Sequence, residues 1–179
     1  MQHPTADARP TFEQIETAHR RIKRHIVTTP VVSDPGLNEL LGCDLYLKCE
    51  NFQGIGAFKI RGAMNAILSL RERGMIADVA THSSGNHGAA VAAAATLDGR
   101  GAVIVMPDNA VGVKIHNVRR HGGDIRFCAA SQAAREEGLQ KLVDAGLVPI
   151  HPYDHHDIIC GQGTAALEML HQQPELDVL

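Results

Sequence analysis

The feature that most constrains the fold of this chain is a regular alternation of short apolar segments with longer helical ones between residues 79 and 150. Such an alternation is typical of βαβ units, in which parallel strands are covered by helices on both faces of the sheet. The sequence therefore predicts an α/β fold with parallel twisted sheets and flanking helices. Strands are expected at 79–82, 102–106, 124–128 and 147–150, and helices at 88–97, 111–121 and 131–144.

The segments outside this region predict further elements. Thr11 and Gln14 fit a capping box, which opens an amphipathic helix that extends to about His25. The remaining expectations are a strand at 44–49, a helix at 58–73 that is ended by Gly74, a helix at 163–172 and the beginning of a strand at 176–179.

Composition and charge argue against several classes of protein. The net charge is −3, no basic run occurs, and the aromatic residues are few (Trp 0, Tyr 2, Phe 4), so nucleic-acid binding is not expected. No apolar run approaches the roughly 18 residues that span a membrane, so no membrane partner is expected either. Residues 1–14 lack the apolar stretch of a secretory signal, and we therefore expect a cytoplasmic protein.

Cysteine and histidine spacings give no sign of disulfides or of a metal site. The four cysteines form no CxxC pair, and we expect reduced thiols in or near the core. His82 and His87 belong to no HExxH motif, and the adjacent His155 and His156 would point in different directions, so no metal site is expected. The cysteines are Cys43, Cys49, Cys128 and Cys160.

The stretch GIGAFKIRGA, residues 54–63, places a lysine at the expected start of a helix. It satisfies neither GxxxxGK[ST] nor GxGxxG, so it is not a nucleotide-phosphate loop by pattern. The helix dipole disfavours a cation at this end, and burial beside Phe58 would also lower the pKa of Lys59. A lysine with a lowered pKa is a candidate Schiff-base nucleophile. The alternative is a solvated lysine whose neighbouring glycines serve an ordinary turn.

The stretch THSSGNHGAA, residues 81–90, predicts an anion site where a strand runs into a helix. Two hydroxyls, a glycine and free backbone N–H groups at a helix N-terminus suit a carboxylate. The alternative is a capped βα turn, which favours the same residue types. A third stretch, ICGQGTAALE at 159–168, predicts a turn at Gly161 and Gly163 into a helix capped near Thr164, for which a purely structural role is the alternative.

These stretches together resemble the fold type II pyridoxal-phosphate enzymes, specifically the serine/threonine dehydratase and serine racemase group. The resemblance extends over nearly the whole chain from TFEQIETAHRRI onward. It rests on KCENFQGIGAFKIRGA (48–63), THSSGNHGAA (81–90), VMPDNA (105–110) and HPYD…IICGQGTAALEML (151–170).

The resemblance implies roles for particular residues. Lys59 would bind pyridoxal 5'-phosphate as a Schiff base and later move the α-proton, with Phe58 packed beside the pyridine ring. Asn86 would bond the phenolic oxygen of the cofactor. Ser84 would act on the opposite face of the substrate, as in the racemases of the group. The loop that takes the substrate carboxylate would consist of Ser83, Ser84, Gly85, Asn86 and His87.

The resemblance also implies an activity. A β-hydroxy amino acid, the expected small-molecule substrate, would be converted to a 2-oxo acid and ammonia by a dehydratase (ammonia-lyase), or serine would be racemised. SSGNHG favours the racemase-like branch over the SAGNH of many threonine dehydratases, although hydroxyaspartate ammonia-lyases share the loop. Members of the group are commonly dimers, so a homodimer is expected.

The resemblance covers the N-terminal half of the family only. It implies a complete small α/β domain at 79–150 and a truncated large cofactor domain at 1–78 and 151–179. The family's GSFK is GAFK here, with Ala57 in place of serine. The glycine-rich phosphate loop, the partner of the pyridine nitrogen and the divalent-cation ligands of the family have no counterpart in this sequence. The alternative is therefore a truncated or split form without catalytic activity of its own.

Overall fold

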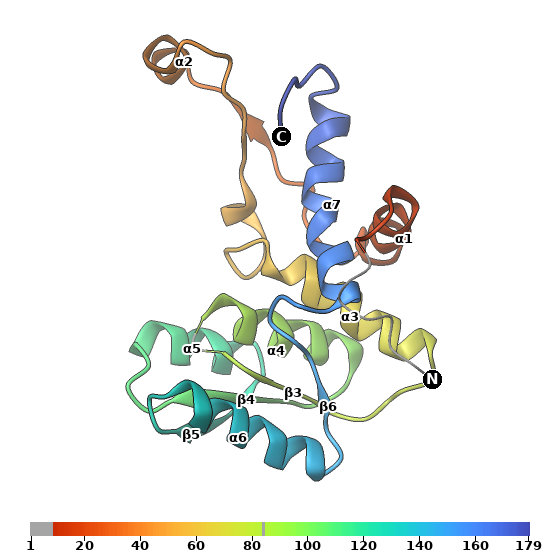
Figure 1. The fold of residues 1–179 in the computed structure, drawn as a ribbon, viewed down its shortest axis with the longest axis vertical. Coiled ribbons are helices and arrows are strands. Elements are labelled where there is room, and N and C mark those ends of the chain that lie inside the picture. Colours follow the sequence, from red (N-terminus) through yellow and green to blue (C-terminus); the bar gives the residue numbers. More distant parts are fainter. Residues whose placement is uncertain (1–8, 84) are drawn as a thin grey trace.

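A parallel sheet and a group of long helices make up the fold shown in Figure 1. The computed structural model describes residues 9–83 and 85–179. The sheet with its helices occupies the lower part of that view, and α1, α7 and a short antiparallel pair of strands lie above it. The helix α3 lies between these two regions and packs against both α4 and α7.

The sheet has four parallel strands in the order β5-β4-β3-β6. Its central strands are buried on both faces, which explains why they are almost entirely apolar in sequence. Thr81 pairs with Ile104, and Ile104 pairs with Ile125 on the next strand. The strands are β3 (Val79–His82), β4 (Ala102–Pro107), β5 (Asp124–Cys128) and β6 (Val148–Pro149).

Helices cover both faces of this sheet, as the sequence predicts. The helices α4 (Asn86–Asp98) and α5 (Gly112–Arg120) lie on one face and α6 (Gln132–Asp144) lies on the other. The alanine-rich α4 is buried on nearly all sides. A side chain at Gly88 would bring its Cβ to 2.9 Å from Ile104 Cγ2, so glycine permits the close approach of α4 to β4.

The region above the sheet is built around three helices. The predicted capping box is confirmed, because the side chain of Thr11 accepts from the backbone of Gln14 and the side chain of Gln14 accepts from the backbone of Thr11. The helices are α1 (Phe12–Ile22), α3 (Lys59–Glu72) and α7 (His156–Gln172), joined by α2 (Pro35–Leu41), the 3₁₀ turn Glu50–Phe52 and the antiparallel strands β1 (Val31–Val32) and β2 (Leu47–Lys48).

The predicted turn before the last helix is wrong. The helix α7 begins at His156 and runs through Gly161 and Gly163 without interruption. A Cβ at Gly161 would lie 2.6 Å from the Cα of Gly62 on α3. The glycine therefore lets two helices cross at close range, and it does not form a turn.

Two further expectations at the ends of the upper region differ from the structure. The segment 44–49 contributes only Leu47–Lys48 to a strand, and 176–179 forms none.

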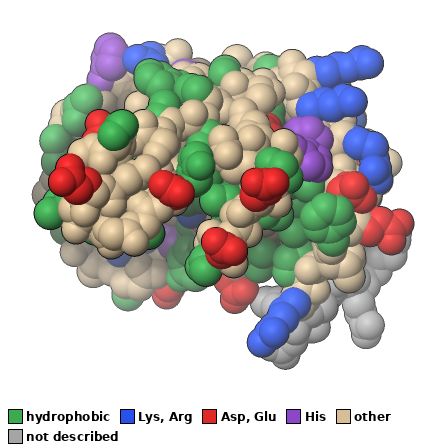
Figure 2. Space-filling model, turned by 90° about the horizontal axis from the view of Figure 1, so that it is seen from above, with side chains coloured by type: hydrophobic (Ala, Val, Ile, Leu, Met, Phe, Trp, Pro, Cys, Tyr) green, Lys and Arg blue, Asp and Glu red, His purple; other side chains and the backbone are tan. Residues whose placement is uncertain are grey.

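Cys43 is exposed, while Cys160 is buried, and all four cysteines are free thiols. Seen from above, this end of the molecule shows hydrophobic side chains between acidic ones (Figure 2), and Leu40 and Leu41 of α2 are among the exposed residues. In the described part of the chain, no helix combines the length and apolarity needed to cross a membrane.

Candidate active site

Lys59 is the first residue of α3, as the sequence predicts, and its amine has few partners. Its Nζ donates a hydrogen bond to the carbonyl of Pro152 at 3.1 Å and lies 5.2 Å from the centre of the Phe58 ring. Among residues 9–83 and 85–179, no carboxylate forms an ion pair with it. Burial lowers the pKa of Lys59, because the charged form loses solvation without gaining a counter-ion.

The loop before Lys59 is shaped by glycine. Gly56 has φ +75°, a conformation that residues with a Cβ rarely adopt, and its N–H donates to the carbonyl of Gln53. The space beside Gly54 and Gly56 is open, with no atom within 4 Å of a Cβ built at either position. The loop therefore presents open space at Gly54 and Gly56.

The second predicted stretch lies where β3 ends and α4 begins. Ser83 Oγ accepts a hydrogen bond from the N–H of Gly85 at 3.1 Å, and no side chain caps α4 at Gly85. The first N–H groups of α4, at Asn86 and His87, have no acceptor within the helix and can bind an anion. Ser84 lies outside the described residues.

The ring of His87 is buried behind this loop, with 4% of the residue exposed. Its Nε2 lies 3.3 Å from the carbonyl of Ile150, and its Nδ1 has no hydrogen-bond partner in the described residues. Burial lowers the pKa of His87 to about 4, and the charges of Lys59, His151 and His82 act in the same direction. The ring is therefore neutral near pH 7 and ties the loop to the segment after β6.

The fold brings Lys59 and the start of α4 together through that segment. The carbonyl of Pro152 accepts from Lys59, and the carbonyl of Ile150 faces His87. Both stretches thus meet at the C-terminal ends of parallel strands, where α/β proteins bind their ligands. The sequence reasoning missed these two carbonyls, because a backbone acceptor leaves no signal in residue type.

Two cations, Lys114 and Arg135, and the imidazole of His82 lie near the same region. The Nζ of Lys114, on α5, lies 3.8 Å from the Cβ position of Gly85. Burial lowers the pKa of His82, and the nearby charge of Arg135 lowers it further, opposed by Glu136. The sequence reasoning missed Lys114 and Arg135, which stand in no recognisable motif. The third predicted stretch does not join this site, because Gly161 lies at the crossing of α7 and α3.

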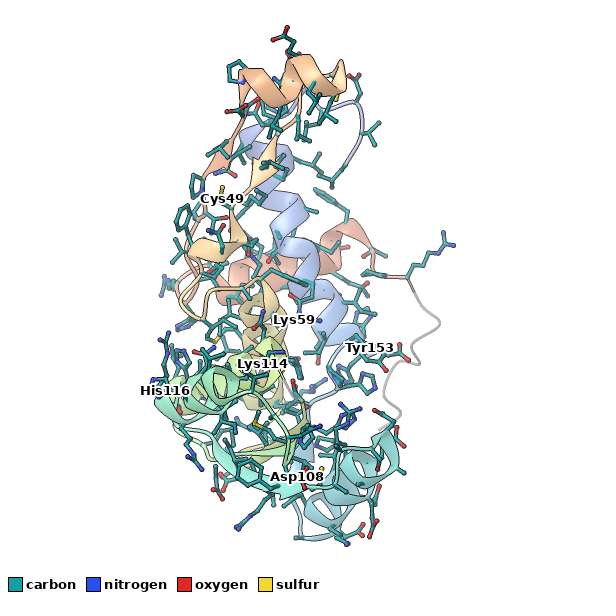
Figure 3. The ribbon with its side chains drawn as sticks, turned by 90° about the vertical axis from the view of Figure 1, so that its left-hand side faces the viewer. Cys49, Lys59, Asp108, Lys114, His116 and Tyr153 are labelled. Atoms are coloured by element: carbon teal, nitrogen blue, oxygen red, sulfur yellow. The ribbon has the colours of Figure 1, made fainter. Side chains whose placement is uncertain are left out.

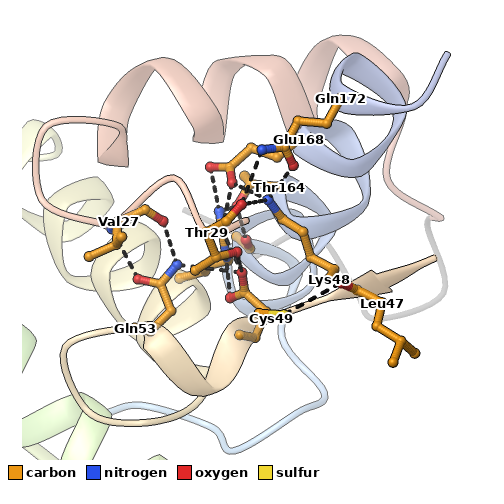
Figure 4. A network of polar contacts seen from close by, with 12 residues as sticks. Val27, Thr29, Leu47, Lys48, Cys49, Gln53, Thr164, Glu168 and Gln172 are labelled. Carbon is orange, nitrogen blue, oxygen red and sulfur yellow. Dashed lines mark hydrogen bonds and ion pairs between the residues drawn. The ribbon is translucent and has the colours of Figure 1, made fainter. Parts of the chain in front are cut away.

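A separate polar cluster holds α3 just beyond Lys59 (Figure 4). Arg61 is fully buried and donates to both oxygens of Glu50, at 2.7 and 2.8 Å, and to both oxygens of Glu168, at 2.9 Å each. Lys48 Nζ donates to Glu168, to Gln172 and to the carbonyl of Thr29. Burial, the largest single influence, raises the pKa of both glutamates, but the hydrogen bonds and charges of Arg61, Lys48 and the other donors together lower the pKa of each. We name Lys48, Glu50, Arg61 and Glu168 the Arg61 cluster.

Comparison with known proteins agrees with this geometry. The profile of the family described as "Pyridoxal-phosphate dependent enzyme" matches residues 22–179. The chain belongs to this family. It is 46% identical over 171 residues to a beta-hydroxyaspartate dehydratase of Paracoccus denitrificans, covering 95% of this chain and 54% of that protein. It is 47% identical over 166 residues to a serine racemase of Arabidopsis thaliana, covering 92% of this chain and 50% of that protein.

The solved structures extend this similarity to the fold. The structure of maize serine racemase superposes with a TM-score of 0.90 at 45% identity, covering 92% of this chain and 50% of that one. The fold type II architecture expected from the sequence is thereby confirmed. The chain spans about half the length of the relatives that it matches.

The described residues fit the aldehyde end and the ring of pyridoxal phosphate. The amine of Lys59 is held by one carbonyl and has no paired carboxylate, which suits a nucleophile. Phe58 is 42% exposed and offers an apolar face beside that amine.

Proposed function

We infer that this chain carries the lysine-bearing part of a pyridoxal-phosphate enzyme that acts on a β-hydroxy amino acid, as a serine/threonine ammonia-lyase or a racemase. The observation that carries this is the setting of Lys59. Its amine lies at a helix N-terminus, is partly buried and has only the carbonyl of Pro152 as a hydrogen-bond partner among the described residues. Serine racemases and a beta-hydroxyaspartate dehydratase among the relatives support this class of substrate.

Lys59 and Phe58 would bind the cofactor, and Lys59 would also move the α-proton. When bound, pyridoxal phosphate supplies an electron sink that stabilises negative charge at the α-carbon of an amino acid. Lys59 would hold the cofactor covalently and, once released, would remove the α-proton, since its lowered pKa favours the neutral amine that a base requires. Phe58 would flank the ring.

The start of α4 would orient the substrate. The backbone N–H groups of Asn86 and His87, with the positive end of the helix dipole, would bind the α-carboxylate together with Ser83 and Gly85. Asn86 would also bond the phenolic oxygen of the cofactor. Ser84 would exchange a proton on the face opposite Lys59, which would allow racemisation. Loss of the β-hydroxyl and of ammonia would otherwise give a 2-oxo acid.

The experiment that tests this function separates cofactor binding from turnover. The 179-residue chain is mixed with pyridoxal phosphate and examined for the visible absorbance of a lysine imine, with Lys59→Ala as the comparison. The same sample is assayed for 2-oxo acid from serine, threonine and β-hydroxyaspartate. A band without turnover would favour the alternative of a form that is inactive on its own. The absence of any band in the wild-type chain would contradict the proposed role of Lys59.

We also propose the organisation expected from the sequence. Residues 79–150 would form one unit and residues 1–78 with 151–179 would form the other, in a cytoplasmic homodimer. Limited proteolysis would locate the boundary between the units, and analytical ultracentrifugation would give the oligomeric state.

A further inference from the structure

An apolar cavity lies between α3, α6, β6 and the start of α7. Its volume is about 370 Å³, which is within the range of small-molecule pockets in proteins. Its described lining residues include neither Phe58 nor Lys59, and none comes from the described part of the 83–87 loop. The cavity is therefore distinct from the candidate active site.

The wall of this cavity is built by segments that lie far apart in the sequence. Helices α3 and α7 contribute buried side chains, whereas the side chains from α6 and β6 are half-buried. The edge of β6 offers no backbone donor at Pro149, so it is a poor place for an added peptide strand and suits a small molecule better. The apolar lining residues include Ala66, Leu70, Leu139, Val148, Ile150 and Ile158.

The rim of the cavity carries four ionisable side chains, three of which are already satisfied. Arg73 forms an ion pair with Asp157 at 3.0 Å. Burial lowers the pKa of His151, opposed by the charge of Asp154, and its Nδ1 accepts from the N–H of Asp154 at 2.7 Å, as a neutral ring does. The Nδ1 of His155 accepts from the N–H of Asp157. Within residues 9–83 and 85–179, no side chain donates to the carboxylate of Asp154 or forms an ion pair with it.

The size and the charge of the cavity favour an apolar molecule that carries an ammonium group. An apolar cavity of roughly 150 Å³ holds benzene, so one of about 370 Å³ has room for a six-carbon ring with a polar substituent. Burial of that ring against the apolar wall would supply most of the affinity. An ammonium group would pair with Asp154, whereas a carboxylate would find only Arg73, which Asp157 already neutralises.

We propose that this cavity is a second ligand site, which binds a compact apolar amine and does not depend on the proposed function of Lys59. The two sites share one segment, because the carbonyl of Pro152 accepts from Lys59 while Ile150 and Asp154 line the cavity. Figure 3 shows Tyr153 of this segment between α7 and the sheet, near the level of Lys59. A ligand in the cavity would thus contact the segment that holds the Lys59 amine.

The test uses cyclohexylamine, cyclohexanol and cyclohexanecarboxylate, which share one ring and differ in charge. Their dissociation constants are measured by NMR titration of the ¹⁵N-labelled 179-residue chain at neutral pH and constant ionic strength, without pyridoxal phosphate. We expect the amine to bind about threefold or more tightly than the carboxylate, with the alcohol between them. The largest amide shifts should lie at Leu70, Leu139 and Val148.

Two kinds of variant separate the wall from the rim. Leu139→Trp fills the cavity from a half-buried position on α6 and should weaken all three probes by roughly tenfold or more. Met75→Trp fills it from the loop after α3, and it replaces Leu139→Trp if the spectrum of that variant shows loss of the fold. Asp154→Asn should weaken the amine by about threefold, as for an exposed ion pair, and leave the alcohol unchanged.

Asp144→Asn is the matched control, since it removes one negative charge from the end of α6 at a residue that does not line the cavity. It should change no affinity. Equal affinities for the amine and the carboxylate would overturn the proposal, as would undetectable binding of all three probes. Binding that persists in the folded filling variant, or shifts centred on Lys59 and the start of α4, would also overturn it.

The failure of this proposal can be told apart from failure of the proposed function, because the titration contains no cofactor. A missing imine band would contradict the role of Lys59 and leave the amine site standing. A normal band together with equal binding of the amine and the carboxylate would do the reverse.

Discussion

Lys48 and Lys59 lie on either side of the same loop, and the structure surrounds their amines in opposite ways. Lys48 Nζ donates to three acceptors, one of which is the carboxylate of Glu168, and forms part of the Arg61 cluster. Lys59 Nζ donates to the carbonyl of Pro152 and is paired with no described carboxylate. Lys48 is thus paired with a carboxylate, whereas burial lowers the pKa of the unpaired Lys59 amine.

The difference shows how one short segment can serve stability and chemistry at once. The Arg61 cluster contains two cations and two carboxylates, and it joins the 3₁₀ turn at Glu50 to α3 and α7. Lys59 begins the same helix two residues before Arg61. We infer that the paired charges fix the start of α3 and thereby the position of the unpaired amine.

Exchanging the two lysines for methionine is the strongest test of this contrast. Lys59→Met should abolish the visible band with pyridoxal phosphate, because it removes the amine proposed to form the imine, and should change the free energy of unfolding by less than about 1 kcal/mol. Lys48→Met should keep the band and lower the free energy of unfolding by about 1–3 kcal/mol, since buried acceptors lose their donor. Absorbance and urea denaturation give both values, and a loss of the band in both variants would break the contrast.

Removing the centre of the Arg61 cluster should have the largest effect on stability. Arg61→Met leaves the carboxylates of Glu50 and Glu168 buried without their main partner, so we expect the free energy of unfolding to fall by about 3–5 kcal/mol. Urea denaturation followed by circular dichroism measures it. Arg119→Met, an exposed substitution, should stay within about 0.5 kcal/mol. A small effect of Arg61→Met would mean that the cluster does not anchor α3.

The free energy of unfolding should depend on pH through His87, whose buried ring lies near Lys59 and whose Nδ1 has no hydrogen-bond partner among the described residues. Burial lowers its pKa to about 4 in the folded chain, from an ordinary value of 6.5 in the unfolded one. Its contribution is therefore fully present above pH 6.5 and is lost as the pH falls toward 4, because only the unfolded chain takes up the proton. The loss amounts to about 3 kcal/mol.

The measurement compares unfolding free energies of the wild type and His87→Gln between pH 7 and pH 4. The difference between the two profiles isolates His87 from the other titrating groups. It should shrink steadily as the pH falls, and a difference that is constant across this range would contradict the buried, neutral ring.

The last prediction concerns the helix crossing that brings Glu168 to Arg61. In Gly161→Ala the new Cβ would lie 2.6 Å from Gly62 Cα and 2.7 Å from the carbonyl oxygen of Arg61, both backbone atoms that cannot move independently. We expect a loss of about 1–3 kcal/mol in thermal or urea unfolding. Gly112→Ala on α5, where nothing lies within 4 Å, should be neutral or slightly stabilising.

The sequence predicted the sheet region well for a physical reason. The bounds of β3 and β5 agree with the expected 79–82 and 124–128, because β3 is a short buried segment and β5, although largely exposed, follows the turn signal at Gly122 and Gly123. The helix α2 was missed although Asp34 caps its N-terminus, Pro35 is its first residue and Gly42 ends it in the left-handed conformation. Those signals were present, and they could have been used.

The site was predictable only in part. Lys59 at the start of a helix was expected from sequence and is confirmed. The start of α7 was not, because Gly161 and Gly163 usually interrupt helices, and here a tertiary crossing uses their small size. Arg61 pairs with Glu168, which lies 107 positions further along the chain, and such a pairing has no local sequence pattern. The roles assigned to Ser83, Asn86 and His87 stay predictions.

The central claim is that burial without a paired carboxylate makes the amine of Lys59 the proposed reactive group of this site. The most direct test treats the 179-residue chain with pyridoxal phosphate, fixes the adduct with borohydride and locates the modified lysine by mass spectrometry of proteolytic peptides. We predict that the modification lies at Lys59, with little at Lys48 or Lys114. Modification spread over the exposed lysines, with none enriched at Lys59, would contradict the account.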